Sequence, residues 1–177
     1  MASEAKTMSL AGWARAIAIG RRPERTVRRL VLIVGLGVVA ILLFTFVFRP
    51  IQINGPSMYP TFHTGQLNLL NRYAYLWHEP QRGDVVGIRY SGDHTMLVKR
   101  VVGLPGETIA FTRQGVLING QHLDEPYLKQ PPGGSAPETR HLGPDEYYVA
   151  GDNRSMSYSG ATERRRIIGR VMFGGSL

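Results

Sequence analysis

The 177 residues include no cysteine, which excludes disulfide bonds, a thiol nucleophile and a thiolate metal site. The formal net charge is +8, but residues 1–29 carry seven Lys and Arg against two acidic residues, whereas the remainder carries 14 against 11. Because the larger part of the chain is only weakly basic, we expect no nucleic-acid partner.

Residues 30–48 read LVLIVGLGVVAILLFTFVF, without a charge or a proline. A helix of this length spans about 28 Å, close to the hydrocarbon thickness of a bilayer. A buried core helix would be amphipathic, and a cleaved signal peptide would have a shorter apolar region followed by small residues. We therefore predict a transmembrane helix at 30–48.

The positive charge before this helix predicts its orientation, because Lys and Arg concentrate on the cytoplasmic side of a membrane. Residues 1–29 are expected to form a basic cytoplasmic tail, and residues 49–177 an extracytoplasmic domain in the cell membrane. Within the tail, residues 9–22 are as consistent with an amphipathic helix on the inner leaflet as with disorder.

Two prolines and a glycine surround Ser57 in the stretch NGPSMYPT, at residues 54–61. Such residues are common in a surface turn, but they also fix the direction of a nucleophile. Further along, the stretch RYAYLWHEP contains Tyr73, Tyr75 and Trp77. These aromatic side chains fit a membrane interface and the core of the domain equally well.

The rest of the chain favours short β-strands, at 84–90, 96–102, 107–111, 115–118 and 146–150, which are rich in β-branched and aromatic residues. Tight turns are predicted at 104–107 and at Asn119-Gly120, a typical hairpin turn. Residues 129–144 are dense in Pro and Gly and indicate a loop. The predicted fold is mostly β: a transmembrane helix followed by an antiparallel β domain.

Lys99 is the best candidate for a base that would activate Ser57. The chain has 18 Arg and only three Lys, and Arg cannot lose its proton in a protein. Strand alternation places Lys99 on one face with Leu97 and Val101, where burial would lower its pKa. The alternative is a lysine on an edge strand whose ammonium group reaches water.

Other candidate chemistries are weaker. The five histidines lie in polar or turn-like contexts without metal-ligand spacing, so we expect no metal and no cofactor. A Ser-x-x-Lys pattern occurs only at Ser3 and Lys6, in the charged tail, and is interpreted as chance.

Three blocks of sequence resemble bacterial type I signal peptidase in its single-span form, the membrane-anchored Ser–Lys endopeptidase. They are Ser57-Met58-Tyr59-Pro60-Thr61, then Arg82-Gly83-Asp84-Val85-Val86 with Lys99-Arg100-Val101-Val102-Gly103-Leu104-Pro105-Gly106-Glu107, and finally Gly151-Asp152-Asn153-Arg154-x-x-Ser157. The resemblance is specific because all three blocks occur in this order after a single predicted transmembrane helix. It implies an all-β catalytic core with a partly closed, barrel-like sheet.

The resemblance also implies roles for individual residues. Ser57 corresponds to the nucleophile, and its backbone N–H contributes to the oxyanion hole. Lys99 corresponds to the general base and Ser157 to the serine that orients it. Arg100 and Asp152 correspond to a structural ion pair. Gly55 stands where some members have a serine that adds a hydroxyl to the oxyanion hole.

The same resemblance implies where a substrate would bind. It would lie as an extended strand along residues 51–55 and 96–99. Ile51, Ile53 and Val98 would line shallow pockets for small side chains.

One block departs from the family pattern. After Ser157 the family has an Asp that braces an arginine, which here corresponds to Arg166, but this chain has about five extra residues and no Asp at that place. Either Glu163 replaces the missing carboxylate or the brace is absent.

The resemblance implies a signal peptidase that cleaves secretory preproteins after a small residue, through an acyl-enzyme, with the lipid bilayer as its second partner. A self-cleaving repressor-type Ser–Lys protease would need a DNA-binding module and no membrane span. A non-catalytic, membrane-anchored assembly factor on the same fold remains the alternative, although such a protein could lose the dyad that this chain retains.

Overall fold

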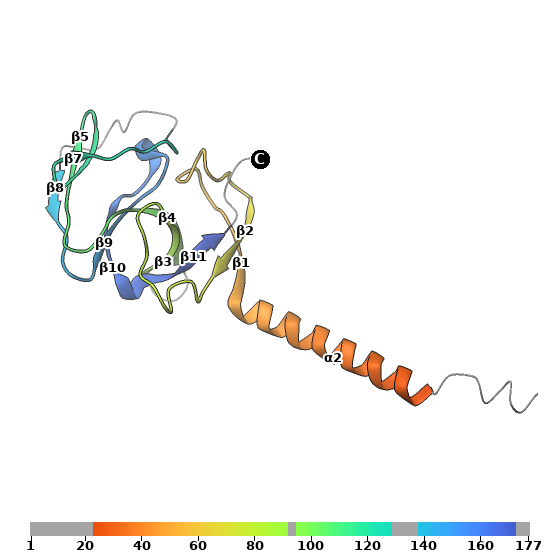
Figure 1. Ribbon diagram of the computed structural model, residues 1–177. Helices are drawn as coiled ribbons and strands as arrows, with labels where there is room; N and C mark the ends of the chain where they lie inside the picture. Colours follow the sequence, from red (N-terminus) through yellow and green to blue (C-terminus); the bar gives the residue numbers. More distant parts are fainter. Residues whose placement is uncertain (1–22, 92–94, 129–137, 173–177) are drawn as a thin grey trace, which may run out of the picture. The chain divides into compact units, whose positions relative to one another are not determined.

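The computed structural model describes residues 23–91, 95–128 and 138–172 (Figure 1). The segment 9–22, most of the expected tail and residues 129–137 of the expected loop lie outside these residues. The elements are α2 (Pro23–Val47), β1 (Phe48–Gln52), β2 (Leu67–Asn71), β3 (Val85–Ser91), β4 (Thr95–Gly103), β5 (Thr108–Thr112), β6 (Gly115–Ile118), β7 (Gln121–His122), β8 (Glu138–His141), β9 (Glu146–Ala150), η1 (Arg154–Met156), β10 (Gly160–Glu163), η2 (Arg164–Arg166) and β11 (Ile167–Met172).

Helix α2 is the expected apolar helix with different ends. It begins at Pro23, seven residues earlier than predicted, because proline is well tolerated in the first turn and the polar residues that follow are compatible with a helix. It ends at Val47, since Pro50 disfavours helical geometry at the residue before it. Residues 25–47 are long and apolar enough to cross a membrane, with a mean hydropathy of 3.0.

A division between two compact units falls after Phe44, so the last residues of α2 belong to the same unit as the β domain. This unit is built around a seven-stranded sheet of order β1-β2-β11-β3-β4-β9-β10, in which every pair is antiparallel. The sheet curls, but β1 and β10 remain its two edges, so it does not close (Figure 1). The predicted fold, mostly β with a partly closed antiparallel sheet, is therefore confirmed.

A second sheet has four antiparallel strands in the order β7-β6-β5-β8. The hairpin predicted at Asn119-Gly120 joins β6 to β7, and both residues have positive φ, 52° and 83°. The loop predicted at 129–144 is wrong over residues 138–141, which form β8 against β5. All four residues of β8 are exposed and three are charged or histidine, so no apolar alternation marks this strand.

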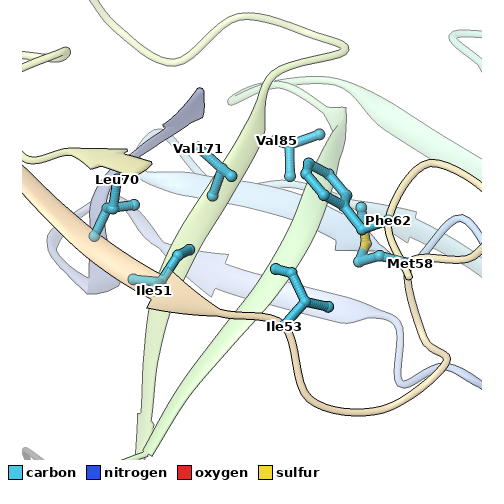
Figure 2. Close-up of a cluster of buried hydrophobic side chains, with 7 residues drawn as sticks. All are labelled: Ile51, Ile53, Met58, Phe62, Leu70, Val85 and Val171. Carbon is cyan, nitrogen blue, oxygen red and sulfur yellow. The ribbon is translucent and has the colours of Figure 1, made fainter. Parts of the chain in front are cut away.

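Three clusters of buried side chains form the core. The one that supports Ser57 contains Ile51, Ile53, Met58, Phe62, Leu70, Val85 and Val171, whose side chains point into a common interior (Figure 2). Met58 and Phe62 are among the most deeply buried side chains of the described residues. The turn that carries Ser57 is therefore fixed to the core by the residue that follows it.

Candidate active site

Ser57 is the second residue of a tight turn. The Tyr59 amide donates to the Pro56 carbonyl at 3.0 Å, and the Phe62 amide donates to the Met58 carbonyl at 2.9 Å. Gly55 has a φ of +92°, which a residue with a side chain rarely adopts, and it lets the chain turn just before the serine. Ser57 itself is half-buried, so its side chain remains at the domain surface while its neighbours fill the core.

The backbone carbonyl and the backbone N–H of Ser57 differ in their hydrogen bonding. Its carbonyl accepts a hydrogen bond from the Asn153 amide at 3.0 Å, which joins the turn to the chain after β9. In the part of the chain that the structure describes, its N–H has no acceptor. A fixed backbone N–H that is available beside a serine hydroxyl is the kind of donor that could stabilise an oxyanion.

Lys99 lies on β4, between β3 and β9, and is only 3% exposed. Its Nζ donates to Ser157 Oγ at 2.9 Å. Burial lowers the pKa of Lys99, and the negative charge of Asp152 opposes that shift. The alternative, in which the Lys99 ammonium group reaches water, is therefore wrong, because the residue is buried.

Ser157 accepts a hydrogen bond from Lys99 and so holds the lysine side chain in place. The Ser157 hydroxyl donates its own proton to the Tyr158 carbonyl at 3.0 Å, which leaves its oxygen to accept from Lys99 Nζ. Among the described residues, this hydrogen bond of Lys99 goes to Ser157 and not to Ser57. The lysine rotamer is thus fixed by a neutral group that adds no charge to the site.

Gly151 brings the two serines together. A Cβ at this position would lie 2.0 Å from Ser157 Oγ and 2.3 Å from the Ser57 carbonyl oxygen. Both serines therefore approach the same backbone atom, and any side chain there would displace them. The structure thus brings Ser57 and Ser157 together at one glycine, and Lys99 reaches the same place through its hydrogen bond to Ser157. Sequence reasoning did not recognise the role of this glycine.

Arg100 points away from Lys99 and forms a two-pronged ion pair with Asp152, at 2.9 and 2.7 Å. Its Nη1 also donates to the Gly83 carbonyl at 2.8 Å. The Thr61 hydroxyl donates to the same Asp152 carboxylate. This buried pair connects β4, the chain after β9 and the segment that carries Ser57.

A second buried ion pair was missed by sequence reasoning. Arg154 donates to Glu125, and the Tyr127 hydroxyl donates to the same carboxylate at 2.6 Å. The Tyr127 ring lies 4.0 Å from the Arg100 guanidinium, so Tyr127 connects the two ion pairs. Glu125 lies in a polar segment that contains a proline, and nothing in this local sequence predicts that its side chain is buried.

Of the residues expected to line substrate pockets, Val98 lies on the opposite face of β4 from Lys99. Ile51 and Ile53 are buried in the core cluster, and Val98 packs against it with part of its surface exposed. A separate pocket of about 250 Å³ adjoins Lys99 and Leu97. Its walls come from residues 88–90 and from the divergent segment after Ser157.

In that divergent segment, Glu163 does not brace Arg166. Its carboxylate accepts a hydrogen bond from Arg165, whereas Arg166 donates to the Tyr90 carbonyl at 3.2 Å. Arg166 therefore binds a backbone carbonyl instead of the expected carboxylate.

The model of one protein family, described as signal peptidase, peptidase S26, matches residues 26–174. The chain is 34% identical over 162 residues to "Signal peptidase I S" of Bacillus subtilis (strain 168), covering 86% of this chain and 78% of that protein. It is 36% identical over 153 residues to "Signal peptidase I" of Leptolyngbya laminosa, covering 78% and 74% respectively.

Among solved structures, the crystal structure of a signal peptidase I from Enterococcus faecalis V583 matches 53% of this chain and 97% of that chain. The sequence identity is 25% and the TM-score is 0.47.

Proposed function

Because the chain belongs to the signal peptidase family, peptidase S26, we propose that Ser57 and Lys99 are the nucleophile and the general base with which it cleaves signal peptides. The observation that carries this proposal is the burial of Lys99 and its hydrogen bond to Ser157, beside the Ser57 turn. A buried lysine with a lowered pKa can be neutral at moderate pH and can accept a proton.

In the proposed reaction, neutral Lys99 takes the Ser57 hydroxyl proton as Ser57 Oγ attacks the carbonyl carbon of the scissile bond. The Ser57 N–H stabilises the resulting oxyanion. The Lys99 ammonium then gives its proton to the leaving amine, and an acyl-enzyme remains. Lys99 next takes a proton from water as the water oxygen attacks the ester carbon. The ester bond then breaks, and the Lys99 ammonium gives its proton to Ser57 Oγ, which restores the free serine and the neutral lysine.

Substrate binding along β4 is supported by the register of the sheet. Strand β9 pairs with β4 only at Arg100, Val101 and Gly103, whereas β3 pairs with it from Thr95 to Arg100. Residues 96–99 therefore have a strand neighbour on one side only among the described residues. An extended peptide can add to such an open edge through main-chain hydrogen bonds.

A preference for substrates with small side chains before the cleaved bond is consistent with the limited exposure of the three residues expected to line the pockets. Ile51 and Ile53 are buried, and only part of Val98 is exposed, so pockets floored by these three side chains would be shallow. The proposed anchor is α2, with the basic residues before it on the cytoplasmic side and the β domain outside.

The test uses the full chain in lipid nanodiscs and one secretory precursor, with the new N-terminus identified by mass spectrometry. Ser57→Ala and Lys99→Met should each abolish cleavage, while Ser155→Ala, a matched loop variant, should retain it. Cleavage by Ser57→Ala at the rate of the unchanged chain would overturn the assignment. An unchanged chain that binds the precursor without cleaving it would favour the assembly factor.

A further inference from the structure

Asn68 is a buried polar side chain that lacks a hydrogen-bond partner. It lies on β2 and is only 4% exposed. Among the residues that the structure describes, neither its Oδ1 nor its Nδ2 has a partner, and no other buried side chain is left in this state. Because an unpaired amide in an apolar interior destabilises a fold, the missing partner is to be sought in a ligand.

The neighbours of Asn68 belong to the core cluster that supports Ser57. In the register of the sheet, Asn68 lies directly opposite Ile51 of β1. Along β2 it shares the buried face with Leu70, and both Ile51 and Leu70 are members of that cluster (Figure 2). Directly opposite residues have Cβ atoms about 4.5–5.5 Å apart on one face of the sheet, so the unpaired amide lies beside the Ile51 side chain.

The same cluster receives side chains from both segments that are proposed to hold the substrate. Ile51 and Ile53 come from the first segment, and Val98 from the second packs against them. Strand β1 is an edge of the sheet, so it can accept an added strand, as residues 96–99 can. Side chains of a bound peptide that point toward the domain would therefore meet this cluster and the Asn68 amide within it.

The spacing of Ile51 and Ile53 identifies the substrate residue that faces Asn68. Ile53 is nearer to Ser57 in the chain, and in Figure 2 its side chain lies between those of Ile51 and Met58. In an extended peptide, alternate side chains point to the same side about 6.6 Å apart, as residues 51 and 53 do in β1. The residue just before the cleaved bond would thus lie near Ile53, and the third residue before the bond near Ile51 and Asn68.

We propose that Asn68 selects substrates with a hydroxyl side chain, Ser or Thr, at the third residue before the cleaved bond. The proposal rests on the proposed function, which supplies the extended substrate. A hydroxyl group both donates and accepts, so it can pair with either end of the Asn68 amide. A charged side chain would be buried without a counter-charge, and an apolar one would leave the amide unpaired in the complex.

The test compares two precursor peptides that differ only at the third residue before the cleaved bond, which is Thr in one and Val in the other. These side chains differ by a hydroxyl in place of a methyl group. A second pair carries the same exchange at the second residue before the bond and is the control, because that side chain points away from the domain. The enzymes, all as full chains in lipid nanodiscs, are the unchanged chain, Asn68→Leu and Asn68→Ala.

The unchanged chain should cleave the Thr peptide with a kcat/KM about tenfold higher than that of the Val peptide, the upper range for one neutral hydrogen bond. Asn68→Leu removes the amide and keeps a similar shape, so it should cleave both peptides equally well or favour the Val peptide. Asn68→Ala should also lose the preference and serves if the leucine disturbs the fold, which circular dichroism detects. The control pair should show the same ratio in all three enzymes.

The outcomes separate this inference from the proposed function. Equal cleavage of the Thr and Val peptides by the unchanged chain overturns the inference, as does a Thr preference that persists in Asn68→Leu and Asn68→Ala. In both cases, cleavage that is lost in Ser57→Ala leaves the proposed function intact. If the unchanged chain cleaves none of the four peptides, the proposed function is overturned and the inference falls with it.

Discussion

Lys99 and Ser157 are 58 residues apart in sequence, and the lysine Nζ donates to the serine Oγ at 2.9 Å. Because the Ser157 hydroxyl proton goes to the Tyr158 carbonyl, Ser157 accepts from Lys99 without competing for the proton of Ser57. In the proposed reaction the pair separates two tasks: Lys99 moves the proton, and Ser157 holds the lysine in position to do so.

Ser157→Ala should reduce kcat by roughly 10²-fold, a loss on the scale of general acid–base assistance, with little change in KM or in Tm. The reason is that Lys99 loses the Ser157 hydroxyl, the acceptor that fixes its rotamer. Steady-state kinetics with a precursor peptide measure this. Ser155→Ala and Ser159→Ala are the matched controls and should remain within a few-fold of the unchanged chain. A silent Ser157→Ala together with a damaging Ser159→Ala would mean that the wrong serine has been assigned.

Gly151→Ala should inactivate the enzyme although it adds one methyl group. That methyl would meet Ser157 Oγ and the Ser57 carbonyl at distances far shorter than van der Waals contact, so both serines must move. Gly143→Ala is the control, since its nearest neighbour would lie at 3.6 Å, an ordinary contact. Cleavage rates and circular dichroism distinguish a displaced site from an unfolded domain. Equal activity of the two variants would contradict the proposed packing.

Asp152→Asn should lower the free energy of unfolding by about 3–5 kcal/mol, because it leaves the buried Arg100 guanidinium without its counter-charge. Arg140→Gln breaks an ion pair with Glu146 that is about 40% exposed on the arginine side, and should cost about 1 kcal/mol or less. Denaturant unfolding of the two variants measures the difference. A cost for Asp152→Asn no larger than that for Arg140→Gln would refute the structural role of the pair.

The sequence predicted the strands whose apolar residues mark them, and β9 agrees with its predicted bounds at both ends. It missed β2 and β11 because LNLLN lacks β-branched residues and a glycine interrupts IIGRVM. Strand β8 is fully exposed, so only its pairing with β5 makes it a strand.

For the site, Ser57 and Lys99 stood out by composition and local context, whereas Ser157 was selected among three nearby serines only by resemblance. The roles of Gly151 and of the Glu125–Arg154 pair depend on contacts between distant segments. Local sequence patterns carry no record of such contacts.

The topology predicts which surfaces a reagent can reach in intact cells. The chain has no cysteine, so single cysteines can be introduced as unique labels. A membrane-impermeant maleimide should label Leu67→Cys in intact cells, because Leu67 is exposed on the domain expected outside. Ser9→Cys, in the basic tail, should be labelled only after lysis. The reverse pattern would show that the orientation assigned from the flanking charges is wrong.

The central claim is that Lys99 is neutral when the enzyme works, and the chain allows this to be measured at the residue itself. It has only three lysines, Lys6, Lys99 and Lys129, so lysine labelled with ¹³C and ¹⁵N gives three side-chain signals in an NMR titration, and Lys99→Met identifies one of them. Burial lowers the pKa of Lys99, so its signal should titrate below the other two and together with the acid limb of kcat/KM, with activity rising as pH rises. If Lys99 titrates with the other lysines, near the usual value of about 10.4, while the enzyme cleaves its precursor at neutral pH, Lys99 is not the base.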